Sequence, residues 1–149
     1  MRQIVAGIDG SGRSCVVKES NISAPATDTA VHEIFETVDG LATPPPPGSG
    51  KSIDLGVPVG GARLRIIQGA PGMTAEIHHT DTFDFAAVLD GSIDLVLDDG
   101  SHRLEAGDCA LITGVDHGWL AGPEGCTFAA FVIGIPPLVG KPERLEDVR

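Results

Sequence analysis

The stretch GMTAEIHHTDTFDFAAVLDG, residues 72–91, decides the fold of this chain. Two adjacent histidines are followed by aspartates and threonines, and then by an apolar run. Because successive side chains of a β-strand point to opposite faces, a regular strand places every second residue on one side. The polar residues that share one face in this way are His78, Thr80, Thr82 and Asp84. The stretch therefore predicts an imidazole and a carboxylate on the same side of a strand, with hydroxyl groups between them.

A second polar cluster, GDCALITGVDHGW at residues 107–119, adds another histidine, His117. Two imidazoles and one carboxylate are the donors of a facial metal triad that keeps open coordination positions. We therefore predict that the chain folds so that His78, Asp84 and His117 meet. His79 is the alternative to His78, and it requires a β-bulge that turns it to the inner face.

The rest of the chain from residue 56 onward alternates short apolar runs with glycine-containing turns. Strands spaced at such short intervals indicate an all-β sandwich or barrel. Asp90-Gly91 and Asp99-Gly100 each predict a hairpin between the runs that flank them. The last apolar run, residues 126–135, is followed by Pro136-Pro137, which end it.

The domain organisation follows from composition along the chain. Residues 1–55 are expected to form an N-terminal arm whose first twenty residues make a hairpin or an extended arm. Within it, residues 31–38 could be a strand, and residues 39–52 read as a Pro/Gly linker. The barrel itself is predicted at 56–137, and residues 138–149 form a charged tail, either solvated or a short helix. The GSGKS sequence in the linker is not a phosphate-binding loop, because a proline occupies the first glycine position of that motif.

Length and composition limit the class of protein. A chain of 149 residues with 42% apolar residues is expected to form one globular domain. A net charge of −11 argues against binding nucleic acid or an anionic membrane surface. Three cysteines without a CxxC pair are typical of buried thiols in a reducing compartment, and no apolar run is long enough to span a bilayer. These features predict a soluble cytoplasmic protein.

The residues quoted above resemble the two motifs of the cupin superfamily. Gly72 is followed by five residues and His78, and Asp84 is followed by six residues and Gly91. Thr80 stands where that motif has its second histidine, and Asp84 stands where it has glutamate. The second motif is matched by the residues Gly107, Asp108, Gly114 and His117. The form HHTDTFDF is also similar to a branch of small, single-domain bacterial cupins.

This resemblance implies a double-stranded β-helix, or jelly-roll barrel, whose two sheets enclose a pocket. It implies catalytic and metal-ligand roles for His78, Asp84 and His117, with Fe, Mn, Ni or Zn as the divalent metal. It also implies a homodimer and a small-molecule ligand. The expected function is that of an enzyme acting on a small carbonyl, enol or aromatic compound, by oxygenation, isomerisation, decarboxylation or cyclisation.

Two alternatives remain open from the sequence. Without a metal, the same three side chains form a polar cluster suited to proton transfer on a small carbonyl compound. A non-catalytic cupin that binds or senses a small molecule is the other alternative. Trp119 follows His117 by two residues, so it either lines the pocket mouth or packs beside it. Phe128 and Phe131 have opposite strand parity, so only one of them can face the pocket.

Overall fold

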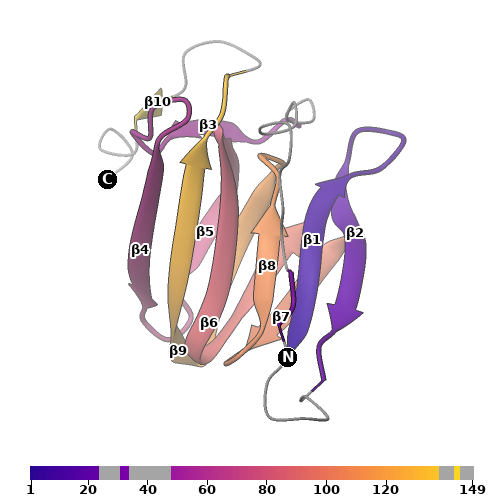
Figure 1. Cartoon of the computed structure of the whole chain (residues 1–149), viewed down its shortest axis with the longest axis vertical. Coiled ribbons are helices and arrows are strands. Elements are labelled where there is room, and N and C mark those ends of the chain that lie inside the picture. The colour runs from indigo at the N-terminus through magenta and orange to yellow at the C-terminus, as the bar shows by residue number, and fades with distance from the viewer. Residues whose placement is uncertain (24–30, 34–47, 138–142, 145–149) are drawn as a thin grey trace.

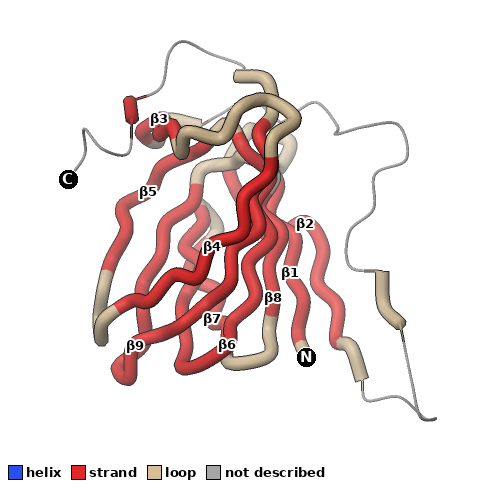
Figure 2. The backbone as a smooth tube through the Cα atoms, turned by 60° about the vertical axis from the view of Figure 1, so that its left-hand side comes forward, coloured by secondary structure: helices blue, strands red, loops and turns tan. Residues whose placement is uncertain are grey.

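The computed structural model describes residues 1–23, 31–33, 48–137 and 143–144, and every regular element in these ranges is a β-strand (Figure 2). The predicted all-β class is therefore confirmed. No helix that could cross a membrane is found in this part of the chain.

All of the strands belong to a single hydrogen-bonded sheet. In chain order they are β1 (Arg2–Ile8), β2 (Ser14–Asn21), β3 (Lys51–Asp54), β4 (Ala62–Gly69), β5 (Thr74–Thr80), β6 (Thr82–Leu97), β7 (Gly100–Glu105), β8 (Cys109–Ile112), β9 (His117–Gly134) and β10 (Glu143–Arg144). The order across the sheet is β10-β3-β5-β9-β6-β8-β1-β2, with β4 paired to β9 and β7 paired to β6.

Two long strands, β6 and β9, give the sheet its curvature. The first half of β6 pairs with the second half of β9, and the second half of β6 pairs with the first half of β9. Both strands bend, so that each contributes to a front and a rear layer (Figure 1). The sheet thus curls into a half-barrel whose two layers face each other, and their inner faces enclose the interior.

The predicted hairpin at Asp90-Gly91 is wrong, because β6 continues through this dipeptide as one strand. The register shifts on both sides of Gly91, which marks β-bulges rather than a chain reversal. Gly91 has a positive φ of 69°, and a Cβ atom there would lie 2.1 Å from the carbonyl oxygen of Gly125 on β9. Glycine is needed here for a bend and a close strand approach, which leave the same sequence signal as a turn. The hairpin predicted at Asp99-Gly100 is confirmed between β6 and β7.

The N-terminal residues form a hairpin that belongs to the same sheet. β1 pairs antiparallel with β2 and parallel with β8, which confirms the predicted hairpin and extends the front layer (Figure 1). Residues 31–33 have no regular structure, and the rest of the strand predicted at 31–38 lies outside the described residues.

The predicted linker and tail differ from the structure at their ends. Lys51 and Ser52, the last two residues of the predicted linker, begin β3 and pair with β5. Residues 39–47 lie outside the described part. In the predicted tail, Glu143 and Arg144 form the short strand β10 beside β3 and not a helix, and the other residues of the tail lie outside the described part. Both segments therefore extend the sheet beyond β5, with β3 paired to β5 and β10 paired to β3.

The core fills one end of the half-barrel, between β1, β6, β7 and β8. Its fully buried side chains include Ile4, Ile93, Leu95, Leu104 and Ile112. Two of the three thiols, Cys109 and Cys126, are buried as predicted, and all three cysteines are unpaired. A cavity adjoins this core between β3, β4, β5, β6 and β9, and Ala86, Phe128 and Ala130 belong to both.

Candidate active site

A cavity of about 600 Å³ lies between the two layers, directly beside the core. Its lining comes from β3, β4, β5, β6 and β9 and is mostly apolar, with Ile53, Ile67, Met73, Ile77, Trp119 and Phe128 among its walls. This volume is within the range of about 300–1,000 Å³ that is usual for small-molecule sites. The polar lining includes three predicted site residues, His78, Asp84 and His117.

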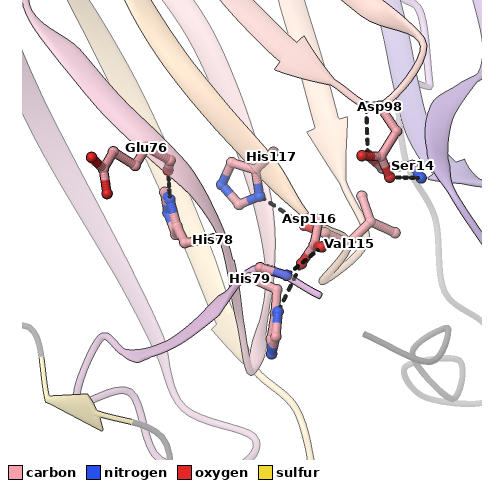
Figure 3. Close-up of polar contacts among 9 residues, drawn as sticks. Ser14, Glu76, His78, His79, Asp98, Val115, Asp116 and His117 are labelled. Carbon is pink, nitrogen blue, oxygen red and sulfur yellow. Dashed lines mark hydrogen bonds and ion pairs between the residues drawn. The ribbon is translucent and has the colours of Figure 1, made fainter. Parts of the chain in front are cut away.

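His78 and His117 meet inside this cavity, as predicted. They are direct partners in the antiparallel pairing of β5 with β9, so their side chains share one face. Their ring centroids are 4.5 Å apart, with the ring planes tilted by 50° (Figure 3). The prediction of His78 rather than His79 as the inward residue agrees with this placement.

Each of the two imidazoles is held by a backbone carbonyl. Nδ1 of His78 lies 2.7 Å from the carbonyl oxygen of Glu76, and Nδ1 of His117 lies 2.8 Å from that of Val115 (Figure 3). A carbonyl oxygen only accepts, so each Nδ1 carries the proton and donates it. Nε2 of each ring is then a lone-pair acceptor, and it is the nitrogen left for a ligand in the cavity.

His117 is the more buried member of the pair, with 2% of its surface exposed. Burial, together with the neighbouring His78, lowers the pKa of His117 to about 4. Desolvation penalises the charged imidazolium, and the electrostatic effect of His78 acts on His117 in the same direction. His117 is therefore a neutral base at neutral pH.

Asp84 lines the same cavity from β6 and ends a chain of hydroxyl groups. The hydroxyl of Thr82 donates to the Asp84 carboxylate, and the hydroxyls of Thr80 and Thr82 are 2.8 Å apart. The shared face predicted for these residues is thus present, although a bend at Asp81 separates β5 from β6. Burial raises the pKa of Asp84 to about 6, against the opposing effects of Thr82 and Arg65. A share of this carboxyl is neutral near physiological pH.

The predicted metal triad is not assembled. In the described ranges, no three His, Cys, Asp or Glu side chains are grouped so that they could hold one ion. The two histidines have the arrangement of metal ligands, since each donates its Nδ1 proton to a carbonyl. Asp84, however, is engaged with Thr82 and is not grouped with the imidazoles, and Thr80 offers a hydroxyl where the motif has a second histidine. The donor set does not fit a two-His-one-carboxylate centre, and the divalent metal stays a prediction.

His79 faces away from the cavity and has a different partner. Its Nδ1 lies 2.8 Å from a carboxylate oxygen of Asp116, whose other oxygen accepts from the backbone N–H of Gly50 (Figure 3). His79 and Asp116 are both buried. The alternation along β5 turns adjacent histidines to opposite sides, so His79 joins β5 to the segment that leads into β3.

The aromatic wall is formed by Trp119 and Phe128. The Trp119 ring meets His117 edge-on at a centroid distance of 5.9 Å and packs against Phe128 at 5.5 Å. Phe128 is thus the residue that faces the cavity, while Phe131 is 41% exposed on the outer face. On the opposite parity of β6, Phe83 is buried away from the cavity and Phe85 is half-buried.

Sequence reasoning missed three charged residues of the lining, Lys51, Arg65 and Glu76. Arg65 alternates with Leu64 and Ile66 along β4, a pattern that would place the arginine outward, whereas the structure exposes Leu64 and Ile66 and turns Arg65 into the cavity. Lys51 lies in register with His78 through the parallel pairing of β3 with β5, a contact that no local pattern indicates.

Comparisons with known proteins give partial matches. No family model matches the chain. Over 98 residues it is 38% identical to phomopsin biosynthesis cluster protein C' of Diaporthe leptostromiformis, a match that covers 65% of this chain and 47% of that protein. Over 61 residues it is 48% identical to phomopsin biosynthesis cluster protein D of the same organism, covering 40% of this chain and 32% of that protein. The chain spans about half the length of the first relative and about a third of the second.

These matches do not show the bacterial branch, which stays a prediction. Among solved structures, the chain is similar to a sugar phosphate isomerase of the cupin superfamily from Silicibacter pomeroyi, with 22% identity and a TM-score of 0.44. That match covers 50% of this chain and 52% of the other.

Within the chain itself, the Gly72–Gly91 motif lies on β5 and β6, and the second motif lies on β8 and the start of β9. The pairing of β5 with β9 brings the two motifs together at one interior cavity. Both motifs thus meet inside a curled all-β half-barrel, which is the arrangement that the resemblance to the cupin superfamily implies.

Proposed function

We propose that this chain is an enzyme that moves a proton within a small carbonyl compound bound in the cavity, by isomerisation or cyclisation. The observation that carries the proposal is the pair His78 and His117, whose Nδ1 protons are both held by backbone carbonyls. Their Nε2 lone pairs are thereby left for a ligand in an apolar cavity. Fixed acceptors of this kind need no reorganisation when a proton is transferred.

The proposed step is enolisation. An imidazole Nε2 of the pair accepts a proton from the carbon next to the substrate carbonyl, and the C–H electron pair becomes the enol double bond. The neutral carboxyl of Asp84 donates its proton to the carbonyl oxygen, which completes the enol. Return of a proton to a different carbon gives an isomer, and attack of the enol carbon on a second carbonyl gives a ring.

The two residues have the acid–base properties that this assignment requires. The pKa of His117 is lowered to about 4, so its ring is neutral and able to accept. The pKa of Asp84 is raised to about 6, so it keeps a protonated fraction near neutral pH. Strongly perturbed pKa values in a cleft are typical of acid–base sites.

The names of the two curated relatives support a role in small-molecule biosynthesis. Both are called biosynthesis cluster proteins, and the first match extends over 65% of this chain. The cavity volume and its apolar walls are consistent with a small organic substrate.

The proposal is tested by hydrogen–deuterium exchange at the carbon next to the carbonyl of phenylacetone, followed by NMR in D₂O. We expect the protein to accelerate exchange, and His117→Gln and His78→Gln each to reduce the acceleration at least about ten-fold. His102→Gln is the matched control, because His102 lies on β7 with Asp99 as its partner and outside the cavity. Exchange that is equally fast in the wild type and in His117→Gln would contradict the proposal.

The same experiment separates catalysis from binding alone. Trp119 is the only tryptophan, and it lines the cavity, so its fluorescence reports occupancy. Phenylacetone that changes Trp119 emission without any accelerated exchange would favour the non-catalytic binding or sensing alternative.

A further inference from the structure

We propose that Arg65 binds an anionic group of the substrate, so that the natural substrate is a small apolar compound carrying a carboxylate. This inference rests on the proposed function, because it names the substrate class of the same cavity. It assigns to Arg65 the role of an anchor that sets specificity, separate from the proton transfer at His78 and His117.

The position of Arg65 in β4 directs its side chain into the cavity. Arg65 is the register partner of Ala130 on β9, and Ala130 pairs in turn with Ala86 on β6. All three residues line the cavity. The small side chains of these two alanines leave open space beside the guanidinium, and a ligand can occupy this space.

The guanidinium retains hydrogen-bonding capacity. One of its Nη atoms donates to the carbonyl oxygen of Leu55 at 2.9 Å. In the part of the chain that the structure describes, Arg65 makes no other hydrogen bond and no ion pair. No buried side-chain nitrogen in this part lacks a hydrogen-bond partner, so the unbonded nitrogens of Arg65 are not buried. The remaining N–H groups are therefore accessible from the cavity, and their planar fork matches a carboxylate.

The charge on Arg65 is incompletely compensated where it lies. The residue is half-buried, and burial lowers its pKa against the attraction of Asp84. Asp84 itself is held by Thr82 and makes no ion pair with Arg65. A bound carboxylate would offset the desolvation of the guanidinium, which makes an anion a better ligand for this end of the cavity than a neutral group.

Arg63 provides an internal comparison on the same strand. It has the same parity as Arg65, but its guanidinium is exposed, donates to the carbonyls of Leu55 and Gly56, and does not line the cavity. The two arginines share the carbonyl of Leu55 as an acceptor, but of the two only Arg65 lines the cavity.

The other walls define the rest of the ligand. Trp119 and Phe128 form an aromatic surface beside His117, and Ile67 follows Arg65 by two residues on the same face. A flat apolar or aromatic group fits against this surface while a carboxylate at the opposite end meets Arg65. The carbonyl carbon to be activated then lies between the anchor and the imidazole pair.

The test compares 3-phenylpropanoate with its neutral analogue 3-phenylpropanamide, with binding followed through Trp119 fluorescence. We expect the wild type to bind the acid roughly ten- to hundred-fold more tightly than the amide, as for charge-assisted hydrogen bonds. Arg65→Gln should abolish this preference by weakening the acid alone. Arg65→Lys, which keeps the charge without the fork, should retain part of it, and Arg63→Gln should leave it unchanged.

The inference is overturned by equal affinities of the two probes for the wild type, by a preference that persists in Arg65→Gln, or by binding of neither probe. Its failure is distinguishable from failure of the proposed function. Probe binding read through Trp119 fluorescence requires no proton transfer, so it tests the Arg65 anchor alone. Exchange of the neutral phenylacetone, compared between the wild type and His117→Gln, tests the proposed function, because phenylacetone carries no anionic group for Arg65.

Discussion

His78 and His117 face each other at one register position of β5 and β9, with their rings 4.5 Å apart and each Nδ1 bound to the chain's own backbone. The tautomer and the orientation of both rings are therefore set by the fold before any ligand binds. A site built in this way has its proton acceptors positioned in advance, and the first prediction follows from their acid–base properties.

The rate of phenylacetone exchange should depend on pH in a bell shape. Below about pH 4, His117 becomes protonated and can no longer accept, and above about pH 6 the Asp84 carboxyl loses the proton that it donates. The two limbs should be seen in a profile measured from pH 3.5 to 8. In Asp84→Asn the upper limb should disappear, and an upper limb that persists in this variant would assign it to another group.

Asp84→Asn should also stabilise the protein, but only at higher pH. The folded-state pKa of about 6 lies above the ordinary value of 3.8, so the folded state binds this proton more tightly than the unfolded state. The stabilisation is present below pH 3.8 and is lost as the pH rises through 6. Asparagine cannot ionise and avoids this loss.

Urea unfolding at pH 4 and pH 7.5 checks this expectation. The free energy of unfolding of Asp84→Asn should exceed that of the wild type by up to about 3 kcal/mol at pH 7.5 and by much less at pH 4. An effect of the same size at both pH values would show that packing, rather than ionisation, is responsible.

Removal of divalent metal should leave the exchange activity within about two-fold of its starting value. The reason is the donor set, in which Asp84 is held by Thr82 and does not join the two imidazoles. The measurement is phenylacetone exchange before and after dialysis against EDTA, with metal content determined by mass spectrometry. Activity that is lost and then restored by one added ion, together with loss of that ion in His117→Ala, would establish the predicted metal enzyme instead.

Gly50→Ala should destabilise the fold without reaching the cavity. A Cβ at this position would lie 2.7 Å from a carboxylate oxygen of Asp116, which is buried and hydrogen-bonded to His79. We expect a loss of about 1–3 kcal/mol in unfolding free energy, because displacement of the Asp116 carboxylate would break its buried hydrogen bond with His79. Gly10→Ala is the control, since a Cβ there meets nothing.

The affinity of the folded Gly50→Ala protein for 3-phenylpropanoate should equal that of the wild type. His79 and Asp116 are not part of the cavity lining, so their displacement should not alter the ligand space. A weakened affinity with unchanged stability would mean that this buried pair supports the ligand site directly.

Local pattern predicted the all-β class, the hairpin at Asp99-Gly100 and the shared face of Thr80, Thr82 and Asp84. These features depend on strand alternation and on turn residues within a few positions of one another. The same reasoning failed at Asp90-Gly91, because a glycine that permits a bulge and a glycine that permits a turn are identical in sequence. Which of the two occurs depends on whether a partner strand continues past it, as β9 does here.

The sequence by itself determined which side chains share a strand face, and through motif spacing it determined that His78 and His117 would meet. Only the tertiary structure decided that Asp84 stays apart from them, that His79 joins Asp116, and that Arg65 and Lys51 enter the cavity. The physical reason is that alternation along one strand is fixed locally by backbone geometry. Distances between strands arise from the register and curvature of the whole sheet, which no short stretch of residues encodes.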